Sequence, residues 1–252
     1  MNLKPANLLY NYLQFMQFDM HKAMMNHKLK QVSPILTGRW LDIGAGDQPY
    51  KKYFSQSEAY KTTNTRRHYT TTDFEQLKDQ TTYWIEDGKA LPLPDQTMDG
   101  VACFQVLSVI DKPEDFFKEI SRVLKPGGKL VLTTDFLYPV WSKEDRFRHS
   151  AFSLQSLACE SGFDEAETES FGGFGSAVYA LFMRYMRSFP EIWKRKSALA
   201  KSLSLIPYLL LLLLLPIISL KGCIIFLLEK NNRQSTAFTF NILLVARKKR
   251  SL

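Results

Sequence analysis

A carboxylate and two glycines stand together at the end of an apolar segment near the start of the chain. The segment WLDIGAG places Asp42 at the end of the apolar run, and Gly44 and Gly46 follow it with only Ala45 between them. Glycines at the carboxyl end of a strand let the backbone approach a bound cofactor, and a following helix start would supply free N–H donors. The sequence motif of dinucleotide-binding proteins requires a further glycine where this chain has Pro49. The proline therefore disfavours a nicotinamide cofactor.

Two further acidic positions follow short strand-like segments. The second predicted strand, residues 68–72, leads into Asp73, whose carboxylate could accept two hydrogen bonds from ribose hydroxyls or could cap a helix. The third, residues 82–85, leads into Asp87 and Gly88, where an acid and open backbone suit the amino group and ring edge of adenine. Acids at successive strand ends indicate a cofactor that contains adenosine.

The segments around these residues alternate between strand and helix patterns. Strands are predicted at residues 39–43, 68–72, 82–85, 100–104, 129–133, 163–171 and 241–246, and helices at 6–30, 113–124 and 153–161. Such alternation is typical of an α/β fold with a Rossmann-like, doubly wound sheet, here of about seven strands. We expect a helical element at 1–34, packed on the next domain or acting as a lid, a nucleotide-binding domain at 35–175 plus 236–250, and a helical insertion at 176–235.

The charge of the chain is unevenly distributed. The chain has 252 residues, 45% of them apolar, and a net charge of +8. Residues 176–252 hold 13 of the 33 Lys/Arg residues but only two of the 25 Asp/Glu residues. A basic region beside an apolar stretch favours an anionic membrane face, with nucleic acid second. The three cysteines cannot form a paired disulfide framework, which favours a reducing compartment.

The apolar stretch itself contains 19 uncharged residues between Lys201 and Lys221. Its length would suit a transmembrane helix, but the predicted strand at 241–246 requires the chain to return to the same side. Pro207, Pro216 and Gly222 would also interrupt a single helix. We therefore expect a re-entrant hairpin or interfacial helices on the cytoplasmic side of a membrane, the alternative being a buried helical subdomain or a dimer interface. The amino-terminal segment lacks the pattern of a secretory signal.

The motifs together resemble a known family. WLDIGAGDQPY, DGKALPLPDQTMDGVACFQVLSVI and FFKEISRVLKPGGKLVLTTDF are similar to segments of class I S-adenosylmethionine-dependent methyltransferases of the type 11 group, over about residues 35–175. The resemblance implies S-adenosyl-L-methionine as cofactor and no metal. It assigns Asp42, Gly44, Ala45 and Gly46 to the methionine end of the cofactor, Asp73 to the ribose, Asp87 and Gly88 to adenine, and Phe104 and Gln105 to the methyl-transfer site.

The substrate side of the sequence departs from that group. Ser108 and Val109 stand where relatives often have Glu-His, and Trp141 stands near a histidine position of many relatives. The segment EDRFRHS still resembles the relatives, so Asp145, Arg146 and Arg148 are substrate-side candidates, the alternative being a salt-bridged surface loop. His149 and Asp135 are the candidates for a general base, which is needed only if the acceptor must lose a proton.

The leading interpretation is a methyltransferase that acts on a small-molecule or lipid-linked acceptor at a membrane surface. One alternative is a non-catalytic, membrane-associated scaffold that retains the cofactor-binding fold, which the Ser108-Val109 pair favours. Another is an RNA methyltransferase that uses residues 66–69 and 247–250, but the sequence shows no RNA-binding module, so nucleic acid is not the expected partner.

Overall fold

The protein is described here from a computed structural model, which covers residues 18–66, 69–86, 90–140, 142–194, 197–231 and 239–250. The strands are β1 (Gly38–Ile43), β2 (Ser57–Thr65), β3 (Tyr83–Ile85), β4 (Met98–Phe104), β5 (Leu124–Asp135), β6 (Phe163–Phe171) and β7 (Asn241–Lys248). The helices are α2 (Met20–Val32), α3 (Thr71–Leu77), α4 (Pro113–Val123), α5 (Ala151–Glu160), α6 (Phe174–Lys194), α7 (Ala198–Leu213) and α8 (Leu215–Glu229).

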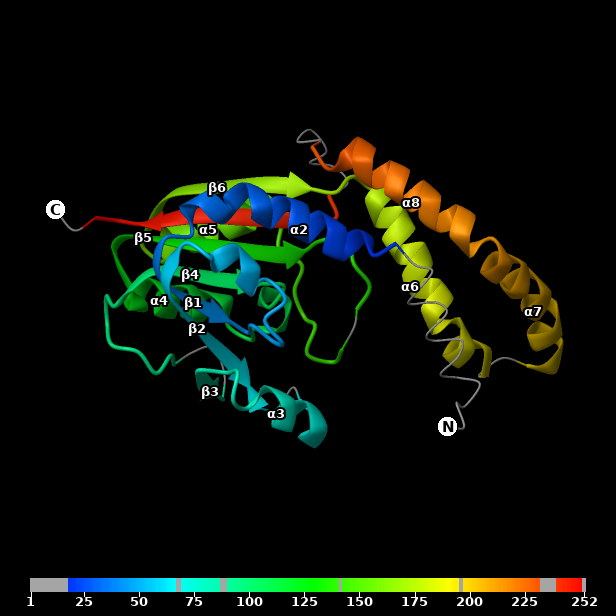
Figure 1. Ribbon diagram of the computed structural model, residues 1–252, viewed down its shortest axis with the longest axis horizontal. Helices are drawn as coiled ribbons and strands as arrows, with labels where there is room; N and C mark the ends of the chain where they lie inside the picture. Colours follow the sequence, from blue (N-terminus) through cyan, green and yellow to red (C-terminus); the bar gives the residue numbers. More distant parts are fainter. Residues whose placement is uncertain are drawn as a thin grey trace.

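The strands form one seven-stranded sheet in the order β3-β2-β1-β4-β5-β7-β6 (Figure 1). Strands β1 to β5 pair in parallel, and β7 is antiparallel to both of its neighbours, β5 and β6. The sheet is doubly wound, because the strand order reverses between β1 and β4. The predicted Rossmann-like fold is therefore confirmed, and the carboxyl ends of β1 and β4 meet at the place where such sheets bind ligands.

Helix α4 shows how local sequence determines an element and its packing. Pro113 occupies the first turn, where its missing N–H costs nothing, and Glu114 and Asp115 place negative charge near the helix amino terminus. Phe116 and Phe117 are fully buried against the sheet. The helix predicted at 113–124 is confirmed to within one residue.

The opposite face of the sheet is covered by α2 (Figure 1). Met20, Met24, Met25 and Leu29 follow one another at helical spacing, and each is at most 2% exposed. Their side chains pack with apolar residues of β1, β4, β5 and β7. The predicted packing of this helix on the next domain is confirmed from residue 20 onward, and residues 6–17 of the predicted helix lie outside the described residues.

The second strand was predicted in the wrong place. Strand β2 is Ser57–Thr65, and residues 71 and 72 of the predicted strand begin helix α3 instead. The error arose because β2 reads SEAYKTTNT, in which threonines and an asparagine replace the aliphatic residues that usually reveal a buried strand. Thr62, Thr63 and Asn64 are nevertheless buried, and the Thr62 side chain contacts Thr82 while the Asn64 side chain bonds to Gly46 and Thr81.

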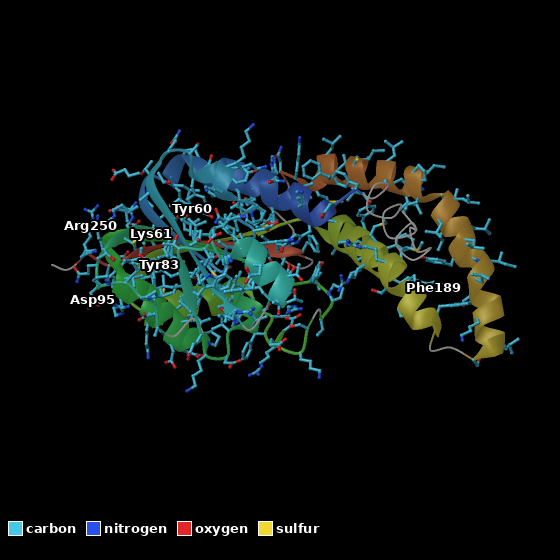
Figure 2. All side chains as sticks on the ribbon, turned by 60° about the horizontal axis from the view of Figure 1, so that its bottom comes forward. Tyr60, Lys61, Tyr83, Asp95, Phe189 and Arg250 are labelled. Carbon is cyan, nitrogen blue, oxygen red and sulfur yellow. The ribbon has the colours of Figure 1, made fainter. Side chains whose placement is uncertain are left out.

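Helices α6, α7 and α8 fill the connection from β6 to β7. Figure 1 shows them extending away from the sheet on the side toward which β5 points, and Figure 2 shows side chains of α7 and α8 projecting outward. Because β6 and β7 are neighbours, both ends of this connection lie in the same sheet. Among the described residues no single helix is long and apolar enough to span a membrane, whereas the pair Ser204–Leu213 and Leu215–Glu229, bent by 63°, would suffice by length and composition.

Specific contacts attach these helices to the domain. The Glu229 carboxylate at the end of α8 accepts hydrogen bonds from the backbone N–H groups of Gly173, Gly175 and Ser176, at 3.0, 2.9 and 2.8 Å. It thereby satisfies donors at the amino terminus of α6, which the helix itself cannot pair. Farther out, the rings of Phe189 on α6 and Tyr208 on α7 stack at 4.0 Å. The hairpin of α7 and α8 therefore has a defined position on α6.

Candidate cofactor and acceptor site

The glycine loop after β1 has the conformation that its residues predict. Gly44 and Gly46 have φ angles of +71° and +56°, which side chains disfavour. A Cβ atom at Gly44 would lie 2.6 Å from Cγ2 of Val106, so the loop after β1 and the loop after β4 meet only because a glycine is present. At Gly46 the nearest atom would be the Tyr69 hydroxyl at 3.8 Å, which leaves that surface open to a ligand.

The loop is fastened to β2 through its backbone amides. The N–H groups of Gly44 and Ala45 donate to the carbonyl of Thr63, and that of Gly46 donates to the Asn64 side-chain oxygen at 2.9 Å. A 3-10 turn at Lys51–Phe54 follows the loop. The loop amides thus already pair with β2. Where a helix start with free N–H donors was expected there is this short turn, in which the N–H groups of Lys51 and Tyr53 donate to the carbonyls of Gln48 and Tyr50.

Asp42 provides the charge at this site. Its side chain is buried, with the Tyr60 hydroxyl donating to Oδ2 at 2.6 Å and with Oδ1 lacking a hydrogen-bond partner. Burial raises the pKa of Asp42 to about 7, although the hydrogen bond from Tyr60 opposes the shift. A buried carboxylate oxygen without a partner is costly, and a cationic ligand group would satisfy it.

The position at the end of β2 belongs to Asn64 rather than to Asp73. The Asn64 amide donates to the Gly46 carbonyl at 3.1 Å, and its oxygen accepts from the Tyr69 hydroxyl at 3.1 Å. Asp73 lies in the first turn of α3, where it forms a capping box with Thr70. The predicted placement of Asp73 at a strand end is thus wrong. The alternative role of helix N-cap belongs to Thr70, and Asp73 is its capping-box partner at the third helical position.

A pocket of about 350 Å³ opens at the end of β3. Trp84, Ile85, Glu86, Ala90, Leu91 and Pro92 line it, and their apolar and aromatic surfaces suit a flat heterocycle. Asp87 and Gly88, which were assigned to adenine, lie outside the described residues. Glu86 and Ala90, the described residues on either side of them, line this pocket.

Phe104 and Gln105 end β4, as predicted. Phe104 is buried, and Gln105 has a φ angle of +60°, which turns its side chain beneath α2. The Gln105 amide donates to Thr133 Oγ1 at 3.2 Å and to Asn241 Oδ1 at 3.1 Å. The structure thus joins the ends of β4, β5 and β7 through one side chain.

Asp135 ends β5 next to this amide, and its neighbour is His21 rather than His149. Oδ1 of Asp135 lies 3.7 Å from Nδ1 of His21 on α2. Burial raises the pKa of Asp135 to about 7 and lowers the pKa of His21. His149 instead has its Nδ1 atom 3.4 Å from the hydroxyl of Ser153 on α5. His21 was not predicted as a site residue, because only the fold brings α2 over β5.

The substrate-side candidates line a second pocket, of about 340 Å³, beside Asp135. Arg148 forms a bidentate pair with Asp145, and Arg146 lies 2.8 Å from Asp111. The pocket wall consists of Phe136, Leu137, Tyr138, Pro139, Val140, Asp145, Arg146, Arg148 and, from α6, Leu181. These residues are therefore salt-bridged, as the alternative proposed, and also face a cavity at the sheet edge.

Comparison with known proteins identifies the class of domain. Residues 41–132 match the profile of the family described as a methyltransferase domain. The chain is 27% identical, over 109 residues, to a phosphatidylethanolamine N-methyltransferase of Cereibacter sphaeroides. That match covers 39% of this chain and 54% of the relative, so the chain spans about half the length of the relative.

Two solved structures share the fold at low sequence identity. One, from Galdieria sulphuraria, was described as a candidate sarcosine dimethylglycine methyltransferase; it is 14% identical with a TM-score of 0.52, and the match covers 88% of this chain and 83% of that one. The other is the cyclase SpnF, 17% identical with a TM-score of 0.52, over 89% of this chain and 81% of that one. Because their reactions differ, these structures support the fold alone.

The strand order and the profile match define a class I S-adenosylmethionine-dependent methyltransferase domain. Residues 41–132, from β1 to β5, match the methyltransferase-domain profile, so the resemblance noted in the motifs of this chain is confirmed. S-adenosylmethionine is the cofactor of this class. The described residues contain no group of three His, Cys, Asp or Glu side chains arranged for a metal ion.

The residues present fit this cofactor. Bound S-adenosylmethionine supplies a methyl group on a sulfonium centre. Oδ1 of Asp42 is an unpaired acceptor suited to an ammonium group, and the bare surface of Gly46 admits a close approach. Asn64 and Tyr69 offer polar atoms for ribose, and the pocket by Trp84 suits adenine. The main task of the chain in methyl transfer is then to orient the cofactor and its acceptor.

Proposed function

We propose that the protein transfers a methyl group from S-adenosylmethionine to a lipid-linked or small-molecule acceptor at the cytoplasmic face of a membrane. The observation that carries the proposal is the continuity between the acceptor-side pocket and the apolar helices. Leu181 of α6 lines the pocket beside Asp135, and α6 leads directly into α7 and α8. An acceptor held in a membrane would therefore reach the end of β5 along α6.

The exposed surface of α7 and α8 supports membrane contact. We call it the apolar ridge; it consists of Ile206, Leu209, Leu210, Leu213, Leu214, Ile217, Leu220, Ile224, Leu227 and Leu228, each between 48% and 75% exposed. An apolar surface of this extent marks an interaction site. Lys201, Lys221 and Lys230 accompany the ridge, and positive charge favours an anionic lipid surface over a second apolar protein surface.

The relative from Cereibacter sphaeroides supports the lipid character of the acceptor. Its name describes methylation of phosphatidylethanolamine, and its similarity to this chain covers 39% of the chain. That relative is a guide to the acceptor class only, because about half of its length has no counterpart in the match.

The direct test uses the purified full-length chain, S-adenosylmethionine with a labelled methyl group, and vesicles of phosphatidylethanolamine and phosphatidylglycerol. We expect label to enter the organic extract only when protein and vesicles are both present. If label enters neither the organic extract nor any small molecule of a cell extract, although the protein binds S-adenosylhomocysteine, the non-catalytic scaffold becomes the better interpretation.

A matched pair of variants tests the membrane contact. Leu213 and Leu228 are each 75% exposed on the ridge, whereas Phe152 is 81% exposed on α5. Leu213→Ser with Leu228→Ser should weaken vesicle binding by about 2 to 4 kcal/mol, or thirtyfold and more, since each leucine would lose its burial in lipid. Phe152→Ser should leave vesicle binding unchanged. Equal effects of both changes, or no vesicle binding by the parent protein, would contradict the membrane proposal.

The proposed topology has a separate test. Cysteines introduced one at a time at Ser197 and Lys249, in a cysteine-free protein, flank the hairpin on the two sides. We expect an impermeant thiol reagent to label both only after cells are opened, since β7 returns the chain to the sheet. Labelling of Lys249→Cys alone in intact cells would establish a membrane crossing and refute the proposed topology.

A further inference from the structure

A group of polar atoms without partners lies beneath α2 at the carboxyl edge of the sheet. Four atoms in the described part of the chain lack any hydrogen-bond partner there: His21 Nδ1, Gln105 Oε1, Asp135 Oδ1 and Asn241 Nδ2. Asp135 is 7% exposed and Asn241 is fully buried. Buried polar atoms in folded proteins are almost always paired, so four unpaired atoms in one place indicate a missing polar ligand.

Strand pairing and close contacts bring these four side chains together from α2, the end of β4, β5 and β7. Asp135 and Asn241 are direct neighbours in the pairing of β5 with β7. The Gln105 amide reaches Asn241 Oδ1 at 3.1 Å, and His21 Nδ1 lies 3.7 Å from Asp135 Oδ1. The distance of 3.7 Å is too long for a hydrogen bond, but one ligand atom could lie about 2.9 Å from both atoms.

The surroundings of the cluster favour a cation. Its unpaired oxygens, from Asp135 and Gln105, can only accept hydrogen bonds or attract positive charge. Aromatic rings complete the enclosure, since those of Tyr138 and Phe240 lie 5.9 and 5.8 Å from the His21 ring and 6.0 Å from each other. Ring faces attract ammonium groups, including methylated ones. The nearby Arg148 guanidinium is held by Asp145 and by the Tyr138 carbonyl.

We infer that His21, Gln105 and Asp135 bind the amine nitrogen of the methyl acceptor, with Asn241 positioning the Gln105 amide, which makes this protein an N-methyltransferase. The inference rests on the proposed function and specifies the atom that is methylated. An acceptor that offered an anionic oxygen here would meet the Asp135 carboxylate and be repelled. The aliphatic remainder of the acceptor would follow the pocket along Leu181 toward the apolar ridge.

The roles of the residues follow from the proton balance of the transfer. Asp135 holds the acceptor as an ammonium ion, and one N–H bond breaks with its electron pair left on nitrogen. The proton goes to Nδ1 of His21, which is neutral because burial lowers its pKa. The nitrogen lone pair then forms the bond to the methyl carbon, and the bond from that carbon to sulfur breaks with its electron pair left on sulfur.

Other ionisable groups surround this pair. Asp19 at the start of α2 acts on His21, and Arg148 and Asp145 after β5 act on Asp135. Asp135 in turn acts on Tyr50 and Tyr138, and Arg184 and Arg187 of α6 also act on Tyr138. Asp145 and Arg148 neutralise each other as a bidentate pair, and Asp19 is exposed and caps α2, so Asp135 is the buried carboxylate left for the ammonium.

The test compares two short-chain lipids that have the same acyl chains and different headgroups. The full-length protein, saturated with S-adenosylhomocysteine, is titrated calorimetrically with dihexanoylphosphatidylethanolamine or with dihexanoylphosphatidylglycerol. We expect the ammonium lipid to bind at least tenfold more tightly than the hydroxyl lipid. Asp135→Asn should remove that preference, while Asp164→Asn, a matched change of an exposed carboxylate on β6, should retain it.

His21→Gln separates proton transfer from binding. We expect it to bind the ammonium lipid within about threefold of the parent and to methylate phosphatidylethanolamine at least a hundredfold more slowly. Equal binding of the two lipids by the parent protein would overturn the inference, and so would an undiminished preference in Asp135→Asn. Both results leave the proposed function intact, whereas failure of the parent to bind S-adenosylhomocysteine would refute the proposed function itself.

Discussion

The Asp42 carboxyl group gives a quantitative prediction about stability. Its pKa is about 7 in the folded protein, against an ordinary value of 3.8, because burial disfavours the charged form. The unfolded chain therefore loses this proton first as the pH rises. Ionising Asp42 destabilises the cofactor-free fold above the ordinary pKa, and the loss of stability grows until the pH passes the folded-state pKa.

The change to test is Asp42→Asn, which removes the ionisation and keeps the side-chain shape. The two pKa values imply a destabilisation of the parent of about 2 kcal/mol at about pH 5.5 and about 4 kcal/mol at about pH 8. The Asp42→Asn variant also loses about 1 to 3 kcal/mol of unfolding free energy at both pH values. The reason is that the new amide nitrogen meets no acceptor and the hydrogen bond from Tyr60 weakens. That loss cancels in the difference between the two measurements.

The assay is urea unfolding of the cofactor-free parent and variant at these two pH values. The stability of Asp42→Asn relative to the parent should increase by about 2 kcal/mol from the lower to the higher pH. The same variant should bind S-adenosylhomocysteine ten- to a hundredfold more weakly, since a charge-assisted hydrogen bond is worth about 1.5 to 3 kcal/mol. Asp164→Asn provides the control. A relative stability that stays constant with pH would refute the assigned ionisation of Asp42.

Three further substitutions test the architecture of the site and its attachment. Gly44→Ala should lose S-adenosylhomocysteine binding and about 1 to 2 kcal/mol of stability, measured by calorimetry and urea unfolding, because its φ is +71°. Asn64→Ala should weaken cofactor binding at least tenfold with a native circular dichroism spectrum, since the side chain bonds both the N–H and the carbonyl of Gly46. Gly222→Ala should lower the melting temperature, because its Cβ would lie 2.4 Å from the Tyr179 ring and α8 would have to shift.

Elements could be predicted from the sequence where neighbouring residues alone determine their structure. The segment around Asp42 combined an apolar strand with glycines that require positive φ, so its position and turn were predictable. The residues of helix α4 themselves indicate where it starts, which face is apolar and where it ends. Strand β2 was predicted in the wrong place because its polar residues, Asn64 among them, are buried through contacts with the glycine loop and with residues 80–82. Its assignment therefore depended on contacts that no local pattern encodes.

The amino-acid sequence by itself determined the fold class, the cofactor loop and the apolar, basic character of the segment before β7, because periodicity and residue type act over a few neighbouring residues. Only the tertiary structure decided which side chains gather beneath α2 at the carboxyl edge of the sheet. His21 and Asp135 are separated by most of the nucleotide-binding domain in sequence, yet α2 places them 3.7 Å apart. Such a pairing depends on how a helix packs across a sheet, a long-range property that the spacing of residues along the chain does not contain.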